Sequence, residues 1–469
     1  EFGNAVIFVG SRFGRRVALA LLGDDVNEHR PAPVVAHIAQ DRQQVVEGMT
    51  VDRPDVLQAE VLEHALRGDD VLHALLHAVH RACDFIVEEI GSESILVVRQ
   101  DDESIRAFYN VCQHRGNRLV NTSEGSMASF TCAYHSWKYS LDGECVGAQD
   151  EEDFPAGSPC GRKRLAALHC EVFASFVWVN MAEDPVPLQE YLAELYPILQ
   201  AYPFENMIRT QAISVNMPCN WKIVQDNFRE TYHIPTAHPE GLYVNEPDYA
   251  AAQIETLGNG HALLRTAGGQ PSKYLPDGKL VINEYLIEDL ASWGLDPEYY
   301  KGRELEIRKA LQAQKRKLGP GRGHSHYESM SDEQLTDTFL YSIFPNMTLT
   351  CFADGILFLR ALPHASDPEK CTFDTWFYAT GSEDFFTKML TAAGGVSDGV
   401  REPAPREWRN FGEGSLGVIL DGDAGIMEAQ QRGMHSRGYH GAELSGQEKR
   451  IPHYHDLIDS MIAANSRVL

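Results

Sequence analysis

The sequence predicts an α+β protein, with a small β-rich module followed by a larger domain that combines an antiparallel sheet with helices. Two observations carry this prediction. Between about residue 86 and residue 182, short runs rich in β-branched and aromatic residues alternate with turn residues, which is typical of short strands. Beyond residue 187, helical patterns surround a succession of strands, an order typical of mixed domains. We expect these later strands at 339–344, 347–352, 356–362 and 372–379.

The remaining elements follow in chain order. In the β module we expect strands at 94–99, 105–111 and 129–131, and another at 138–143 that the Asp142-Gly143 turn closes. Residues 172–180 are expected to form one buried strand. In the larger domain the periodicity predicts helices at 188–199, 221–233, 299–317, 424–434 and 454–464.

Residues 1–80 differ from the rest of the chain. They contain no Tyr, Trp, Lys or Cys but six histidines, a composition that a shifted reading frame would produce. Apolar residues between 61 and 79 recur with helical spacing, which would place His73 and His77 one turn apart. No ligand motif contains these histidines, so we expect ordinary helix-surface or half-buried side chains. The expected division is an atypical N-terminal segment (1–80), a cluster-binding domain (81–183) and a catalytic domain (184–469).

Composition narrows the class of partner and the compartment. The formal net charge of −26, with no basic stripe, argues against nucleic acid as a partner. Nine scattered cysteines, an odd number, are typical of a reducing compartment rather than of a disulfide framework. No apolar run reaches the roughly 18–20 residues of a membrane span. We therefore expect a cytoplasmic protein with no membrane association.

The most informative motif is Cys112-Gln-His114 followed by Cys132-Ala-Tyr-His135. Each short loop offers one thiolate and one imidazole. A Rieske [2Fe–2S] cluster needs this set, because one iron takes two cysteines and the other takes two histidines. Zinc also accepts two cysteines and two histidines, but zinc modules usually pair like with like, as C-x-x-C and H-x3–5-H. The mixed pairs therefore favour the Rieske cluster over zinc.

A second group of metal-ligating residues follows at 220–238. On a helix, Asp226, Glu230 and His233 would fall at i, i+4 and i+7, hence on one face. Pro235 cannot continue that helix, and the break would bring His238 back toward His233. Two histidines need one carboxylate to complete the 2-His-1-carboxylate set of an oxygen-activating ferrous site.

The sequence leaves the carboxylate open. Asp421 and Asp423 stand out because they precede the helix expected at 424–434, where the helix dipole favours a carboxylate. Taken alone, either aspartate is more simply an ordinary N-cap.

Residues 85–469 resemble the α (large) subunit of the aromatic-ring-hydroxylating oxygenases, which are Rieske non-haem iron oxygenases. The resemblance rests on both cluster motifs and on N-W-K-x7-E-x-Y-H-x4-H, which runs from Asn220 to His238. Ser136 stands where the family usually has glycine. The resemblance implies a Rieske-type β-sandwich domain followed by a helix-grip catalytic domain, assembled as a ring of three α subunits. The family's C-terminal pattern D-x4-E-x2-Q-x-G matches Asp423, Glu428, Gln431 and Gly433, which selects Asp423 as the third iron ligand.

The resemblance also implies roles for two further residues. Glu230 matches an acidic residue that hydrogen-bonds the mononuclear-site histidine and a cluster histidine of the neighbouring subunit, so that the working pair of metal sites forms across the trimer interface. Asn227 matches an asparagine near the iron. Most ring dioxygenases have aspartate in place of Glu230. In having glutamate at this position, the chain resembles family members that act on quaternary amines and other non-aromatic substrates.

The implied activity is that of a terminal oxygenase. Its cofactors would be one [2Fe–2S] cluster at Cys112, His114, Cys132 and His135, and one Fe²⁺ at His233, His238 and Asp423. Its partners would be a reductase that draws electrons from NAD(P)H, with a ferredoxin and a β subunit as further candidates, in a homotrimer or an α3β3 assembly. We expect hydroxylation of an aromatic or polycyclic substrate by O₂, with oxidative demethylation or hydroxylation of a quaternary amine as the alternative. Mono- and dioxygenation both stay open. Phe344, Phe352, Phe358 and Trp376 are candidates for lining an apolar pocket, although core packing is the simpler role.

Overall fold

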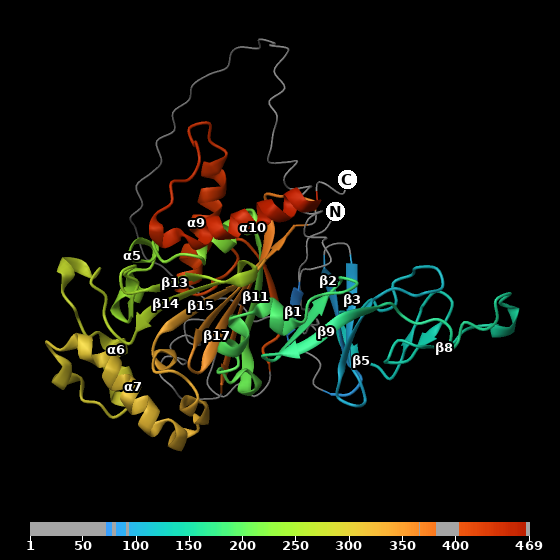
Figure 1. Cartoon of the computed structure of the whole chain (residues 1–469), viewed down its shortest axis with the longest axis horizontal. Helices are drawn as coiled ribbons and strands as arrows, with labels where there is room; N and C mark the ends of the chain where they lie inside the picture. Colours follow the sequence, from blue (N-terminus) through green and yellow to red (C-terminus); the bar gives the residue numbers. More distant parts are fainter. Residues whose placement is uncertain (1–71, 77–80, 91–92, 365, 381–402, 466–469) are drawn as a thin grey trace, which may run out of the picture.

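The computed structural model describes residues 72–76, 81–90, 93–364, 366–380 and 403–465. Two large sheets, one small sheet and several helices make up this part of the chain, in agreement with the predicted α+β class (Figure 1). Of the helices described, none has the length and apolar character needed to cross a membrane.

The first large sheet belongs to the N-terminal part of the described chain. Its strands lie in the order β1-β10-β9-β4-β3-β2-β5, and all paired neighbours are antiparallel. A separate three-stranded sheet has the order β6-β7-β8. Strand β6 leads into the second cysteine–histidine loop, and β7 and β8 follow that loop. The strands are β1 (Leu72–Leu76), β2 (Asp84–Ile90), β3 (Glu93–Arg99), β4 (Ile105–Tyr109), β5 (Glu124–Ser126), β6 (Phe130–Thr131), β7 (Lys138–Tyr139), β8 (Cys145–Gly147), β9 (Ala167–Phe173) and β10 (Phe176–Asn180).

The second large sheet forms the centre of the larger domain. Its order is β12-β14-β15-β16-β17-β18-β11-β19, with β13 paired to β14. All pairs are antiparallel except β11 with β19. The strands are β11 (Met207–Met217), β12 (Asn245–Glu246), β13 (Gln253–Thr256), β14 (Ala262–Gly268), β15 (Thr338–Ile343), β16 (Met347–Phe352), β17 (Gly355–Pro363), β18 (Cys371–Thr380) and β19 (Glu407–Asn410).

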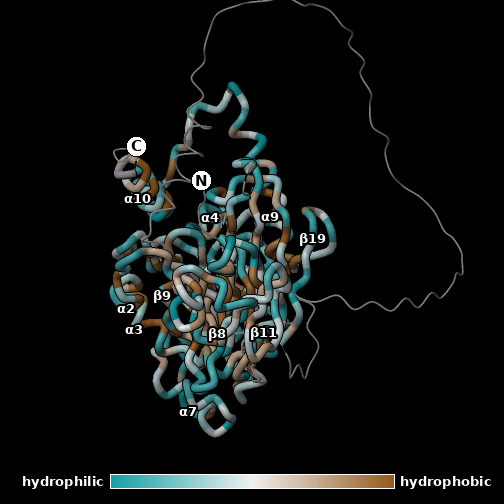
Figure 2. The backbone as a smooth tube through the Cα atoms, turned by 90° about the vertical axis from the view of Figure 1, so that its right-hand side faces the viewer, coloured by the Kyte–Doolittle hydropathy of each residue, from teal (hydrophilic) through white to brown (hydrophobic). Residues whose placement is uncertain are grey.

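Helices cover this sheet at two opposite ends. In Figures 1 and 2, α7 lies far from α9 and α10, with the large sheet between them. The described helices are α2 (Leu188–Leu192), α3 (Leu195–Leu199), α4 (Trp221–Asn227), α5 (Ile234–Ala237), α6 (Glu284–Ser292), α7 (Ile307–Leu318), α9 (Val418–Met434) and α10 (Arg450–Asn465).

One hydrophobic core joins the two large sheets. Phe176 on β10 stacks on Phe358 of β17 with ring centroids 5.8 Å apart, and Phe358 stacks in turn on Trp376 of β18 at 5.2 Å. Each such side chain contributes roughly 1.5–3 kcal/mol by its burial. The four aromatic residues proposed as pocket-lining candidates are all buried in hydrophobic clusters, so packing explains each of them.

Two expectations about the N-terminal half are wrong. Residues 72–76 form strand β1 at the sheet edge and pair with β10, although the apolar spacing around them predicted a helix. The other positions of that pattern, 61–71 and 77–79, lie outside the described residues, as does most of the segment 1–80. Residues 172–180 form parts of two strands, because Ala174 and Ser175 take positive φ values of 53° and 62° and turn the chain into a hairpin.

Helix boundaries in the larger domain also differ from expectation. The segment 188–199 forms two short helices, because Ala193 between them has φ 48°. Helix α7 begins at Ile307 rather than at residue 299, and 3-10 turns precede it. The four strands expected at 339–379 agree with β15 to β18 within one residue at every end.

Candidate metal centres

The two cysteine–histidine loops are built alike. In the first, Cys112 accepts a hydrogen bond from the N–H of Gly116 (3.0 Å) and donates its own N–H to the carbonyl of Asn117 (2.8 Å). In the second, Cys132 makes the same two bonds with Ser136 and Trp137 at the same distances. The residue four positions after each cysteine has positive φ, 73° at Gly116 and 57° at Ser136. That conformation explains why glycine suits this position, and Ser136 adopts it nonetheless.

These loops bring four donors together. The thiols of Cys112 and Cys132 are buried and in contact, and the rings of His114 and His135 lie 4.7 Å apart at the loop tips. His114 stacks on Trp137 at 4.8 Å, and its Nδ1 is buried without a hydrogen-bond partner. Burial opposes ionisation of Cys132, but hydrogen bonds from the N–H of Tyr134, from the Cys112 thiol and from the N–H of His135 together outweigh it and lower the thiol pKa.

The donor set fits a [2Fe–2S] cluster. Two thiols and two imidazoles face one another, one of each from either loop, and the orphaned Nδ1 of His114 has the free lone pair that a metal would take. Both histidines are half-buried, so this end of the small sheet is accessible from solvent. Sequence reasoning missed Tyr139, whose hydroxyl lies 3.4 Å from Cys112 Sγ and accepts the N–H of Gln113 at 2.9 Å.

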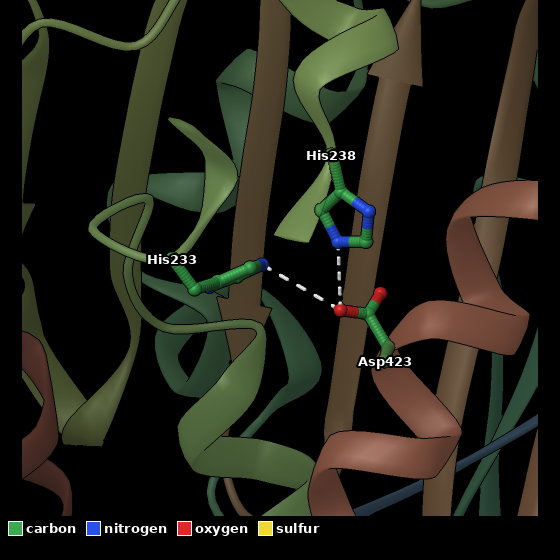
Figure 3. Close-up of side chains that lie close together, drawn as sticks. All are labelled: His233, His238 and Asp423. Carbon is green, nitrogen blue, oxygen red and sulfur yellow. Dashed lines mark hydrogen bonds and ion pairs between the residues drawn. The ribbon is translucent and has the colours of Figure 1, made fainter. Parts of the chain in front are cut away.

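The second group of donors gathers between α5 and α9 (Figure 3). Asp423 Oδ1 lies 2.8 Å from His238 Nε2 and 3.6 Å from His233 Nε2, and one ligand atom from each of the three residues falls within 4.8 Å of the others. Asp423 and His238 are buried, while His233 is partly exposed. Two segments separated by 185 residues therefore meet at this point.

Glu230 sets the orientation of His233. Its Oε1 lies 2.6 Å from His233 Nδ1, and its Oε2 accepts the backbone N–H of His233 at 3.1 Å. Burial disfavours the charged imidazole, but Glu230 and Asp423 outweigh it and raise the pKa of His233. With a proton on Nδ1, the Nε2 lone pair points toward Asp423, which is the arrangement a metal ion requires.

Three donors of this kind, two imidazoles and one carboxylate, fit a ferrous ion that keeps open positions. Two contacts fix the position of helix α9 beside the histidines, one at Gln431 and one at Gly422. Gln431 accepts the N–H of Asn220 at the start of α4 (2.8 Å), and a Cβ at Gly422 would stand 3.4 Å from His238 Cε1. Helix α9 therefore passes within van der Waals reach of the imidazole at Gly422.

The local structure around these donors corrects two expectations. Helix α4 ends at Asn227, so Asp226, Glu230 and His233 do not share one helical face. Asp226 instead pairs with His455 at 3.0 Å, and Pro235 stands in the first turn of the new helix α5. Helix α4 ends here because the next two residues pack on distant partners. Phe228 packs on Phe373, and the Arg229 guanidinium lies 3.8 Å from the ring centroid of Tyr454.

The second correction concerns the aspartates. Helix α9 begins at Val418, so Asp421 and Asp423 lie inside it rather than before it. Asp421 accepts hydrogen bonds from Ser415 Oγ (2.5 Å) and from the N–H of Leu416 (2.7 Å), which leaves Asp423 to face the histidines. Asn227, the last residue of α4, has a buried Nδ2 without a partner.

Two family models match the chain. "Ring hydroxylating alpha subunit (catalytic domain)" matches residues 204–464, and "Rieske [2Fe-2S] domain" matches residues 77–158.

Curated relatives match a shorter stretch. The chain is 38% identical over 161 residues to the glycine betaine monooxygenase oxygenase subunit of Chromohalobacter salexigens, which is 34% of this chain and 35% of that protein. It is 36% identical over 160 residues to the carnitine monooxygenase oxygenase subunit of Escherichia coli K12, which is 34% of this chain and 42% of that protein. The chain thus matches well under two thirds of the length of either relative.

Solved structures share the fold over most of the chain. The quaternary ammonium Rieske monooxygenase CntA, in complex with gamma-butyrobetaine, superposes with a TM-score of 0.58 at 19% identity, covering 86% of this chain and 91% of that chain. Naphthalene 1,2-dioxygenase with indole bound superposes with a TM-score of 0.58 at 20% identity, covering 86% and 90%.

Proposed function

Because the chain belongs to the family of ring-hydroxylating oxygenase α subunits with a Rieske domain, we propose that it is the oxygenase component of a quaternary amine monooxygenase. The family carries a [2Fe–2S] cluster and a mononuclear iron. The reaction proposed is oxidation of an N-methyl group or a neighbouring carbon by O₂, with electrons supplied from NAD(P)H.

The choice of a quaternary amine as substrate rests on the names of the curated relatives. They act on glycine betaine and carnitine, both quaternary amines, whereas an aromatic or polycyclic substrate was the first expectation from the sequence. Aromatic hydrocarbon catabolism is therefore not supported by these relatives. The glutamate at position 230 agrees with the amine assignment.

We assign Cys112, His114, Cys132 and His135 to the cluster and His233, His238 and Asp423 to the iron. When bound, the cluster supplies single electrons and the iron supplies an open site for O₂ beside the substrate. Glu230 keeps the proton of His233 on Nδ1 and so keeps Nε2 directed at the ion.

Glu230 is also placed to connect the iron site with a second subunit. Its side chain is 11% exposed, and the neighbouring Tyr232 is 61% exposed as a residue, so this segment reaches the surface of the single chain. We propose that a cluster histidine of a neighbouring copy docks here, in a homotrimer or an α3β3 assembly. A reductase, directly or through a ferredoxin, would deliver electrons at the exposed side of the cluster loops.

A substrate screen tests the proposal. Hydroxylation of an N-methyl carbon gives a carbinolamine that releases formaldehyde and the demethylated amine. Purified protein with a surrogate reductase and NADH should therefore form formaldehyde, or a hydroxylated or cleaved amine, from glycine betaine or carnitine. Naphthalene offered under the same conditions should give no cis-diol. Diol formation from naphthalene, with no turnover of either amine, would return the assignment to the aromatic class.

A further inference from the structure

A second cluster of two histidines and one carboxylate lies away from the iron site. His324 Nδ1 and His326 Nε2 each lie 2.9 Å from Asp354 Oδ1, and one ligand atom from each residue falls within 4.8 Å of the others. We propose that these three residues bind a divalent transition-metal ion, with Zn²⁺ as the test ion. The proposal does not depend on the substrate or reaction of the oxygenase.

The three donors come from two distant segments. His324 and His326 belong to the long insertion between β14 and β15 that also contains α6 and α7. Asp354 stands in the two-residue turn that joins β16 to β17, where Phe352 pairs with Gly355. An ion held by all three would fasten the insertion to the end of the sheet.

The side chains around the cluster hold it in a fixed geometry. Tyr327 donates its hydroxyl to the other oxygen of Asp354, which sets the carboxylate so that Oδ1 faces the imidazoles. Its ring stacks on His324 with centroids 4.7 Å apart and meets His326 edge-on at 4.9 Å. A side chain at Gly319 would collide with the Tyr327 ring. Such outer contacts that orient metal ligands are typical of metal sites.

Charge and burial favour a cation here. The side chain of Asp354 is fully buried, and those of His324 and His326 are 6% and 13% exposed. Among the described residues, the ion pairs recorded for Asp354 join it only to these two histidines. With neutral imidazoles the carboxylate would be a buried charge without a counter-ion, which is costly. A divalent cation supplies the missing positive charge and uses the imidazole lone pairs.

The spacing of the donors suits a small ion. Zinc binds imidazole nitrogen at about 2.0–2.1 Å and carboxylate oxygen at about 2.0–2.2 Å, so tetrahedral donors lie roughly 3.4 Å apart. The donors here need to open by about half an ångström from their 2.9 Å separations. The donor separations at the iron site are of similar size, since His238 Nε2 and His233 Nε2 lie 2.8 and 3.6 Å from Asp423 Oδ1.

The cluster is separate from the iron site. Helix α4 reaches the far end of β17, where Gln225 donates to the carbonyl of Asn346 and Asn346 accepts the N–H of Ala361. Asp354 and Ala361 are seven residues apart along an extended strand, which is roughly 23 Å. The proposed ion therefore lies at the opposite end of β17 from the iron site, where its role would be structural.

Metal analysis of the iron-loaded protein tests the site. After equilibration with a tenfold excess of ZnCl₂ and removal of unbound ion, elemental analysis should give three irons and one zinc per chain. Crystals of this protein should show an anomalous peak at the zinc edge between His324, His326 and Asp354. The His326→Ala variant should lose the zinc and keep the irons. Tyr327→Phe retains all three ligands and should keep the zinc.

Two controls separate this site from the iron site and from a folding defect. His233→Ala should lose one iron and keep the zinc. Zinc added to the iron-loaded wild-type protein should raise its thermal midpoint, and the same addition to iron-loaded His326→Ala should leave the midpoint unchanged. Zinc-equilibrated wild-type crystals without the anomalous peak would overturn the proposal, whatever the variants do. Equal zinc content in wild type and His326→Ala would do the same, and either result would show a hydrogen-bonded network only.

Discussion

His261 should make the stability of the larger domain depend on pH. The imidazole is fully buried and connects two elements, because its Nε2 lies 2.8 Å from the carbonyl of Tyr191 in α2 and its Nδ1 accepts the N–H of Phe344 at 3.1 Å. A proton on Nδ1 would break the second bond. Burial, assisted by Arg229 and opposed by the Tyr191 carbonyl, lowers the pKa of His261 to about 4.

The size of the effect follows from the difference between the two states. In the unfolded chain the pKa of a histidine is about 6.5, so between pH 6.5 and about 4 the unfolded state binds a proton that the folded state does not. Stability is therefore fully present above pH 6.5 and falls as the pH decreases. At pH 5 the loss is about 2 kcal/mol, and below pH 4 it approaches about 3 kcal/mol.

A comparison with His261→Gln isolates this contribution. Glutamine does not titrate, yet it offers one donor and one acceptor. Urea unfolding of both proteins, followed by tryptophan fluorescence between pH 7.5 and 5.0 at fixed ionic strength, gives the difference in free energy of unfolding at each pH. The wild type should lose about 2 kcal/mol relative to the variant over this range. Parallel pH profiles would refute the assignment of a depressed pKa to His261.

Three further predictions concern the metal centres. Glu230→Gln should retain all three irons but lower coupled turnover roughly 10–100-fold, because the amide orients His233 less firmly; iron analysis with product and peroxide assays checks this. Asp423→Ala should lose one iron per chain while the visible and paramagnetic spectra of the cluster persist, and a retained third iron would argue against Asp423 as a ligand. Tyr139→Phe removes a hydrogen bond to Cys112 Sγ, worth about 0.5–1.5 kcal/mol, and should lower the cluster potential by roughly 20–60 mV in a redox titration; an unchanged potential would contradict that role.

The cluster loops could be predicted from the sequence because their structure is local. Both pairs of ligands lie within four residues, and the same backbone hydrogen bonds recur in each loop. The strands at 338–380 could also be predicted from the sequence. Most of their residues are buried, and their content of β-branched and aromatic residues is high.

The geometry of the iron site was harder to predict from the sequence, because contacts with residues far away in the sequence determine it. Phe228 and Arg229 are adjacent, yet they pack on different partners, Phe373 of β18 and Tyr454 of α10, so the helix ends before Glu230. Spacing alone also left Asp421 and Asp423 equivalent. The resemblance to the family selected Asp423, and the contacts of α9 agree with that choice, since Asp421 is used within its own turn.

The His324–His326–Asp354 cluster had no signal in the sequence. Asp354 follows the two histidines by about thirty residues and sits in a two-residue hairpin turn, a position where aspartate is common for local reasons. Its contact with the histidines depends on how the insertion folds back over the sheet, which no periodicity describes.

His238 and Asp423 lie 185 positions apart in the sequence, and this separation has a consequence for biosynthesis. A ribosome makes both histidines long before it makes the aspartate. The nascent chain can offer at most an incomplete pair of imidazoles until α9 has emerged and packed against α4. With the ligands proposed above, capture of the mononuclear ion would be a late event that waits for α9, whereas the four proposed cluster donors emerge within twenty-four residues of one another.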